Sequence, residues 1–109
     1  MQRSTFLHIE QLLKDYPRMN DYINQYEHNE YFGLDDEKRI LVLKEQQHII
    51  KETIQNMDDE IIETINALYF KREPNLTIDG VALSLNIGRS TLFYRRNKFM
   101  ENVKRLLGW

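Results

Sequence analysis

The 109-residue sequence contains no cysteine, only two prolines and only four glycines. Without cysteine the chain forms no disulfide framework, thiolate zinc site or iron–sulfur cluster, and it has no cysteine nucleophile. It also lacks any apolar run close to the roughly 18 residues that are needed to span a bilayer. Its N-terminal segment carries a charge every few residues, unlike a secretory signal peptide. We therefore expect a cytoplasmic protein with no membrane segment.

The sequence also lacks the clusters of residues that are typical of catalytic or metal sites. The histidines, His8, His28 and His48, are spaced 20 apart and do not form the cluster of three or four ligands that a metal site needs. The acidic pairs at 35–36 and 58–59 stand at expected helix starts, where capping and the helix dipole explain them. No glycine-rich phosphate loop or serine-nucleophile elbow occurs. The sequence predicts no enzyme, no metal and no cofactor.

Charge is distributed unevenly along the chain. The net charge of -2 averages two unlike parts: residues 1–70 hold 7 basic and 14 acidic side chains, a net of -7, whereas residues 71–109 hold 8 basic and 3 acidic, a net of +5. Such asymmetry predicts a polyanion as partner of the C-terminal part and a different role, such as protein contact, for the acidic remainder.

The few prolines and glycines separate segments of helical periodicity. The apolar spacing predicts helices over 5–16, 18–29, 35–57, 58–70, 77–85 and 89–107. Ser4 is a candidate N-cap for the first helix, and Pro17 is expected to end or kink it. The predicted fold is all-α: a helical bundle with a two-helix N-terminal arm at 1–33, split at Pro17, followed by a helical domain at 34–109.

One apolar stripe on the predicted helix 35–57 has two interpretations. Its members recur at alternating spacings of three and four residues: Ile40, Leu43, Gln47, Ile50, Ile54 and Met57. Such a stripe is ordinary for a helix that faces the core of a bundle. It also resembles a short coiled-coil seam in which Gln47 sets the register, and this alternative predicts a homodimer through residues 36–57.

The C-terminal third satisfies the requirements of a helix-turn-helix over 77–107. Two helices that cross at a steep angle need a small residue where they touch, and Ala82 provides it. The turn needs a residue that tolerates positive φ, here Asn86, followed by an apolar plug, here Ile87. Leu92 then begins the buried stripe of the second helix.

The opposite side of that second helix is polar and basic. Counted at 100° per residue from Leu92, the side chains of Ser90, Tyr94 and Asn97 lie near the opposite pole. This layout is typical of a helix that reads base edges in a major groove and is flanked by phosphate contacts. The candidate base-reading residues are Arg89, Ser90, Tyr94 and Asn97. The candidate phosphate-binding residues are Thr77, Thr91, Arg95, Arg96 and Lys98.

Three stretches of the chain carry a family resemblance. The C-terminal LTIDGVALSLNIGRSTLFYRRNKFMENVKRLLG resembles the DNA-binding part of small phage transcription regulators, the RinA and ArpU-like late-gene activators, which is itself similar to the promoter-recognising C-terminal domain of sigma factors. The N-terminal IEQLLKDYPRMNDYINQYE and the central IIETINALYF resemble the corresponding helices of RinA-like proteins. Together these stretches cover over half of the chain, in the order that the family has them.

The resemblance implies a non-catalytic activator of phage or prophage late genes that binds double-stranded promoter DNA and engages bacterial RNA polymerase. The positions that match the family's pattern are Thr77, Ala82, Ile87, Arg89, Ser90, Thr91, Tyr94, Arg95 and Arg96. Two positions depart from it. Gly88 stands where a capping serine is usual, which predicts a slightly weaker helix start. Arg95 stands where an aliphatic residue is common, and its long side chain is able to snorkel towards a phosphate.

Three other interpretations stay open at this point. The C-terminal segment is also compatible with an ordinary helical hairpin whose solvated face is basic. A protein-interaction adaptor would use the basic helix for an acidic partner and the tyrosine-rich acidic half for a second one. A recombinase accessory or terminase-type packaging protein would keep the DNA-binding helices and change the protein partner.

Overall fold

A computed structural model describes residues 1–29 and 33–109, and residues 30–32 of the predicted N-terminal arm lie outside this description. Within the described ranges the chain is helical and has no strand, which confirms the all-α prediction. The elements are α1 (Arg3–Asp15), the 3₁₀ turn η1 (Tyr16–Arg18), α2 (Met19–Glu27), α3 (Leu34–Asn56), α4 (Asp59–Ile65), the π-helical turn η2 (Asn66–Phe70), α5 (Ile78–Ser84) and α6 (Arg89–Leu107).

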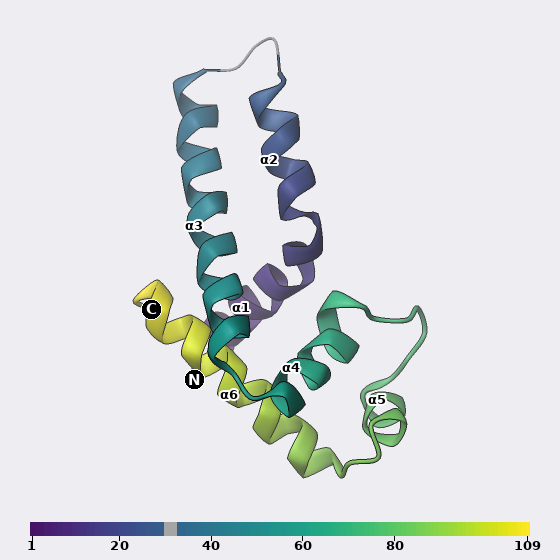
Figure 1. Ribbon diagram of the computed structural model, residues 1–109. Coiled ribbons are helices and arrows are strands. Elements are labelled where there is room, and N and C mark those ends of the chain that lie inside the picture. The colour runs from purple at the N-terminus through teal and green to yellow at the C-terminus, as the bar shows by residue number, and fades with distance from the viewer. Residues whose placement is uncertain (30–32) are drawn as a thin grey trace.

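The helices form an elongated molecule of about 49 × 30 × 26 Å. Figure 1 shows α2 running antiparallel beside the first half of α3, so that this pair projects from the rest of the molecule. Helices α1 and α6 cross at the base of the pair, and α4 and α5 lie around the N-terminal half of α6. The C-terminal residue packs on α1, because the ring centroids of His8 and Trp109 lie 4.2 Å apart with the rings tilted by 30°.

The main core gathers around α6. Its fully buried Phe99 and Val103 pack in one cluster with Ile9 and Leu13 of α1 and with Ile50 of α3. Helix α1 is therefore part of this core, and only α2 with the first half of α3 projects as an arm. The domain boundary near residue 33 stays a prediction, although α1, which lies on its N-terminal side, packs into the main core.

The stripe on α3 faces inward. Ile40 is 6% exposed and Ile50 is fully buried, and Gln47 donates through Nε2 to Oδ1 of Asn20 near the start of α2. The core-facing interpretation therefore describes this stripe. Dimerisation through residues 36–57 stays a prediction, and it would require another side of α3, where Leu41 and Val42 are exposed.

Helix ends agree with the sequence at some positions and differ at others. Helix α1 ends at Asp15 and the chain turns through η1, as expected from Pro17, which fits a first helical turn but not a helix interior. The predicted N-cap at Ser4 is wrong: Gln2 is the extended cap residue, and its carbonyl accepts the first helical bond from the N–H of Phe6 at 3.0 Å. Ser4 lies inside the first turn.

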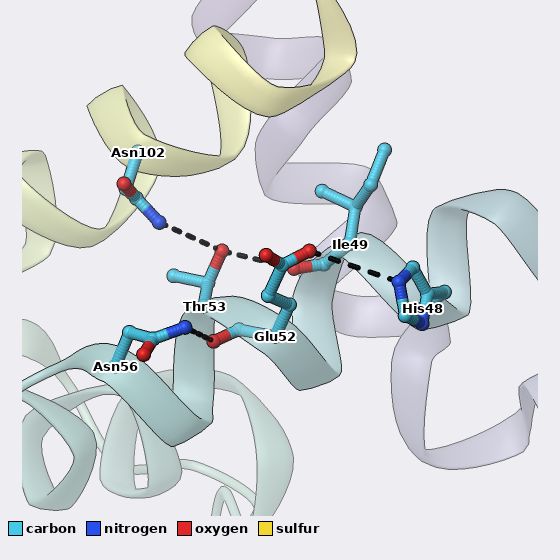
Figure 2. Close-up of polar contacts among 6 residues, drawn as sticks. All are labelled: His48, Ile49, Glu52, Thr53, Asn56 and Asn102. Atoms are coloured by element: carbon cyan, nitrogen blue, oxygen red, sulfur yellow. Dashed lines mark hydrogen bonds and ion pairs between the residues drawn. The ribbon is translucent and has the colours of Figure 1, made fainter.

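A buried polar junction joins α3 to α6 (Figure 2). The hydroxyl of the fully buried Thr53 donates to the carbonyl of Ile49 at 2.9 Å and accepts from Nδ2 of Asn102 on α6 at 3.0 Å. Arg105 donates in turn to Oδ1 of Asn102 at 2.7 Å. Of these three bonds, the one between Asn102 and Thr53 crosses from α6 to α3. Because a hydrogen bond is directional, it favours one rotation of α6 about its own axis relative to α3.

Thr53→Val is expected to lower the free energy of unfolding by about 1–2 kcal/mol, because it leaves the amide of Asn102 without its partner in a half-buried position. Urea unfolding followed by circular dichroism measures the change. The matched control is Asn56→Ala, which removes an exposed bond to the carbonyl of Glu52 one helical turn away. An equal loss in both variants would argue against a special role of the buried junction.

Candidate nucleic-acid interface

Helices α5 and α6 are joined by a tight connection at residues 85–88. Thr77 caps α5, and its Oγ1 accepts a hydrogen bond from the N–H of Gly80 at 3.0 Å. Asn86 has a φ of 56°, the left-handed conformation that the sequence predicts at this position. Gly88 is the N-cap of α6 and provides no side-chain acceptor, as its residue type implies. The predicted left-handed backbone at Asn86 is therefore present in the connection.

A second, smaller core holds α5 against α6. It consists of Leu68 from η2, Val81 and Ala82 from α5 and Leu92 from α6, all of them buried. Ala82 has only a methyl group to bury, which suits the contact of two crossing helices. Ile87 packs half-buried against the same cluster, which is the plug position that the sequence predicts.

The predicted outer face of α6 is exposed. Ser90, Thr91, Asn97 and Lys98 are all exposed, and Tyr94 is 61% exposed. On the opposite side of α6, Leu92, which begins the predicted buried stripe, is inaccessible to solvent, and so are Phe99 and Val103. Met100 lies beside this stripe and is also fully buried, because the core covers more of α6 than one narrow stripe.

Arg95 does not lie on this exposed face, and its predicted phosphate contact stays a prediction. Its side chain is only 16% exposed and lies against α4, with Nη2 3.4 Å from Oε2 of Glu60 and Nη1 3.5 Å from Oγ1 of Thr64. Arg95 is one turn from the buried Leu92, so the packing of α4 on α6 takes its side chain inward. Here Arg95 joins two helices of the protein.

Arg96 is enclosed in a similar way. Its guanidinium carbon lies 4.8 Å from the ring centroid of Phe6 on α1 and 4.8 Å from that of Phe93 on α6. Such placement between two aromatic faces is a favourable cation–π arrangement. Its Nε is buried and has no hydrogen-bond partner within the described part of the chain. Arg96 therefore makes internal contacts on this flank of α6, and its predicted phosphate contact also stays a prediction.

The exposed positive charge of the interface comes mainly from Arg89 and Lys98. Arg89 lies at the start of α6, with Nη1 3.7 Å from Oδ1 of Asp79 on α5 and its guanidinium carbon 5.4 Å from the ring centroid of Phe93. Both partners of this ion pair are well exposed, so the pair is weak and a phosphate is able to replace the carboxylate. Only part of the net positive charge of residues 71–109 is therefore exposed on this face of α6.

Behind the interface, Tyr69 of η2 donates its hydroxyl hydrogen to Oε2 of Glu10 on α1 at 2.7 Å. Burial raises the pKa of Tyr69 far above its ordinary value of 10, and the hydrogen bond to Glu10 adds to the shift. A small cavity of about 230 Å³ borders this pair and reaches Val81 of α5 and Arg96 of α6. The contact ties α1 to the helices that carry the interface.

The raised pKa of Tyr69 predicts a loss of stability in alkaline solution. In the folded protein the phenol stays neutral, whereas the unfolded chain ionises near pH 10, so ionisation favours the unfolded state as the pH rises above 10. Tyr69→Phe is expected to reduce this alkaline decline, while Tyr16, whose pKa is also raised by burial, preserves part of it. Urea midpoints from pH 7 to 11 test this, and the pH 7 difference isolates the lost hydrogen bond. Parallel declines in both proteins would contradict the assignment.

Two further findings describe residues 1–29 and 33–109. No group of three or more histidine, cysteine, aspartate or glutamate side chains is arranged there to hold a metal ion. No helix in this part of the chain is long and apolar enough to cross a membrane. Compared with known proteins, the chain matches no family model, no curated protein and no solved structure.

Proposed function

We propose that this chain is a sequence-specific DNA-binding transcriptional regulator in which α5, the connection 85–88 and α6 form a helix-turn-helix. The observation that carries the proposal is the exposed polar face of α6, with Ser90, Tyr94 and Asn97 turned away from the buried Leu92. A small cluster around Ala82 holds α5 across the back of α6, which leaves that face open to a major groove.

The roles within this interface follow the exposure of each side chain. Base edges are contacted by Arg89, Ser90, Tyr94 and Asn97. Backbone phosphates are contacted by Thr77, Thr91 and Lys98, all of which are exposed. Arg95 and Arg96 support the interface from inside, since α4 and Phe6 hold their guanidinium groups.

The biological role that we propose beyond this comes from the resemblance to RinA and ArpU-like regulators. In that role the protein activates phage or prophage late genes in the cytoplasm of a bacterial host. It does so by placing its acidic part, which carries the net charge of -7 over residues 1–70, near RNA polymerase. The acidic part is repelled by DNA, so a protein surface is the more favourable contact for it.

Fluorescence anisotropy tests DNA binding directly. The full chain is titrated at low salt into a labelled random-sequence duplex, and in parallel into labelled poly-glutamate. A DNA-binding protein binds the duplex with an affinity that falls steeply as salt rises. The opposite result, binding of poly-glutamate without binding of duplex, would favour the adaptor alternative in which the basic helix contacts an acidic protein.

A genomic pull-down with footprinting of the recovered fragments then tests sequence specificity. A single recurring site next to late promoters is expected for the proposed activator. Uniform recovery of genomic DNA would contradict a sequence-specific role, although it would leave non-specific binding by the same helix intact.

A further inference from the structure

The start of α1 lies beside the proposed DNA-binding face. Figure 1 shows the N-terminus close to α6, although the two segments are far apart in sequence. An open pocket of about 380 Å³ lies between the N-terminal segment and α6. The residues that line it are Met1, Arg3 and Phe6 from the N-terminal segment and Arg96, Asn97 and Glu101 from α6.

Several contacts fix this end of α1 on α6. Phe6 covers one face of the Arg96 guanidinium, with 4.8 Å between the ring centroid and the guanidinium carbon. The next turn of α1 contributes the fully buried Ile9 to the cluster that contains Phe99. His8 stacks on Trp109, at a centroid distance of 4.2 Å. Core contacts of α1 therefore place the backbone at Arg3 beside α6.

Arg3 is available for an external partner. Its side chain is exposed, and no ion pair involving it occurs within residues 1–29 and 33–109. This distinguishes it from Arg95, which is bound to Glu60, and from Arg96, which is stacked between rings. Glu101 is the carboxylate among the pocket residues, and it lies one turn beyond Asn97 on α6.

We propose that Arg3 binds a backbone phosphate of the same duplex that α6 reads, so that the DNA interface is made of α1 and α6 together. This inference rests on the proposed function. Contacts that flank a base-reading helix are mostly to phosphates, and a guanidinium offers a phosphate two parallel hydrogen bonds. In this arrangement Asn97 lies at the edge of the base-reading face, and Arg3 contacts the DNA backbone next to it. The acidic first part of the chain thus contributes a basic contact that its average charge conceals.

Arg3→Gln tests the contact in the full chain, with a labelled random-sequence duplex as the probe. Phosphate contacts do not depend on base sequence, so the unknown operator is not needed. Near 0.15 M salt, Arg3→Gln is expected to weaken binding by about fivefold and to reduce the slope of log affinity against log salt by about 0.9. Arg3→Lys is expected to restore the slope, since it keeps the charge while losing the paired hydrogen bonds.

The matched control is Arg18→Gln. Arg18 is exposed and its loss changes the net charge equally, but it lies beyond the far end of α1, about 20 Å from Arg3 along a helix that rises 1.5 Å per residue. Arg18→Gln is expected to bind duplex within about twofold of the affinity of the unaltered chain, and this result supports the proposal. A lost phosphate contact would instead lower the salt slope by about 0.9. Urea midpoints of both variants show whether the fold is retained.

Two other outcomes separate this inference from the proposed function. Equal weakening by Arg3→Gln and Arg18→Gln, with firm binding by the unaltered chain, would overturn the composite interface and leave the role of α6 intact. Absence of duplex binding by the unaltered chain at low salt would overturn both.

Discussion

Phe99→Ala is expected to lower the free energy of unfolding by about 3–5 kcal/mol, which is enough to unfold much of a domain of this size. Phe99 is fully buried, and it lies edge-on to Phe70 with ring centroids 6.4 Å apart. It also shares one cluster with Ile9 of α1 and Ile50 of α3. Removal of the ring therefore opens a cavity where three helices and η2 meet, and thermal or urea unfolding measures the cost.

Tyr94→Ala is the matched control for that change, because it removes an aromatic ring of similar size from the same helix. Tyr94 is 61% exposed, and truncation there is expected to alter stability by no more than about 0.5 kcal/mol. If Phe99→Ala cost less than about 1 kcal/mol, far below the range for a buried ring, the assignment of α6 as the central helix of the core would be wrong. The comparison distinguishes the two sides of α6: the side with Phe99 stabilises the fold, and the exposed side with Tyr94 is available to bind DNA.

The second large effect concerns DNA affinity. Arg89→Gln combined with Lys98→Gln is expected to weaken duplex binding by roughly 30-fold near 0.15 M salt and to lower the salt slope by about 1.8, since two exposed cations of the interface are lost. The exposed positions of both side chains predict little change in stability. Anisotropy titrations at several salt concentrations measure the affinity and the slope together.

Lys38→Gln combined with Lys51→Gln provides the control, because it removes the same charge from exposed positions on α3. Its affinity for duplex is expected to stay within a few-fold of the unaltered chain, since screening limits the reach of surface charges to about 10 Å. A loss equal to that of the Arg89 and Lys98 variant would mean that DNA responds only to net charge and that α6 has no special part.

Local features of the helix pair α5 and α6 could be predicted from the sequence because each depends on neighbouring residues. The positive φ of Asn86 follows from its side chain, and the cap at Thr77 follows from its hydroxyl. The small Ala82 between the helices follows from the steric demand of their crossing. The start of α1 at Arg3 and the π-helical turn at 66–70 were missed, because end positions and helix widening depend on packing as well as local preference.

The internal contacts of Arg95 and Arg96 have a different physical cause. The wheel of α6 puts Arg95 and Arg96 on the flanks of the outer face, where phosphate contacts are expected. Helix α4 covers one flank and α1 covers the other, so Glu60 and Phe6 take the two guanidinium groups. A helical wheel contains no information about such neighbours. A count of charges along the sequence therefore overestimates the basic surface of α6. It also does not show that Arg3 lies beside this helix.

Mapping of amide chemical shifts by NMR, as an unlabelled duplex is added to the isotopically labelled chain, tests the central claim most directly. The proposal predicts that the perturbed amides cluster at the start of α5, along the exposed face of α6 from Arg89 to Lys98, and at Arg3. The chemical shifts of the amides of α2 and of the first half of α3 are expected to stay unchanged. Shifts confined to the α2–α3 pair, or no shifts at low salt, would contradict the assignment of α6 as the DNA-binding helix.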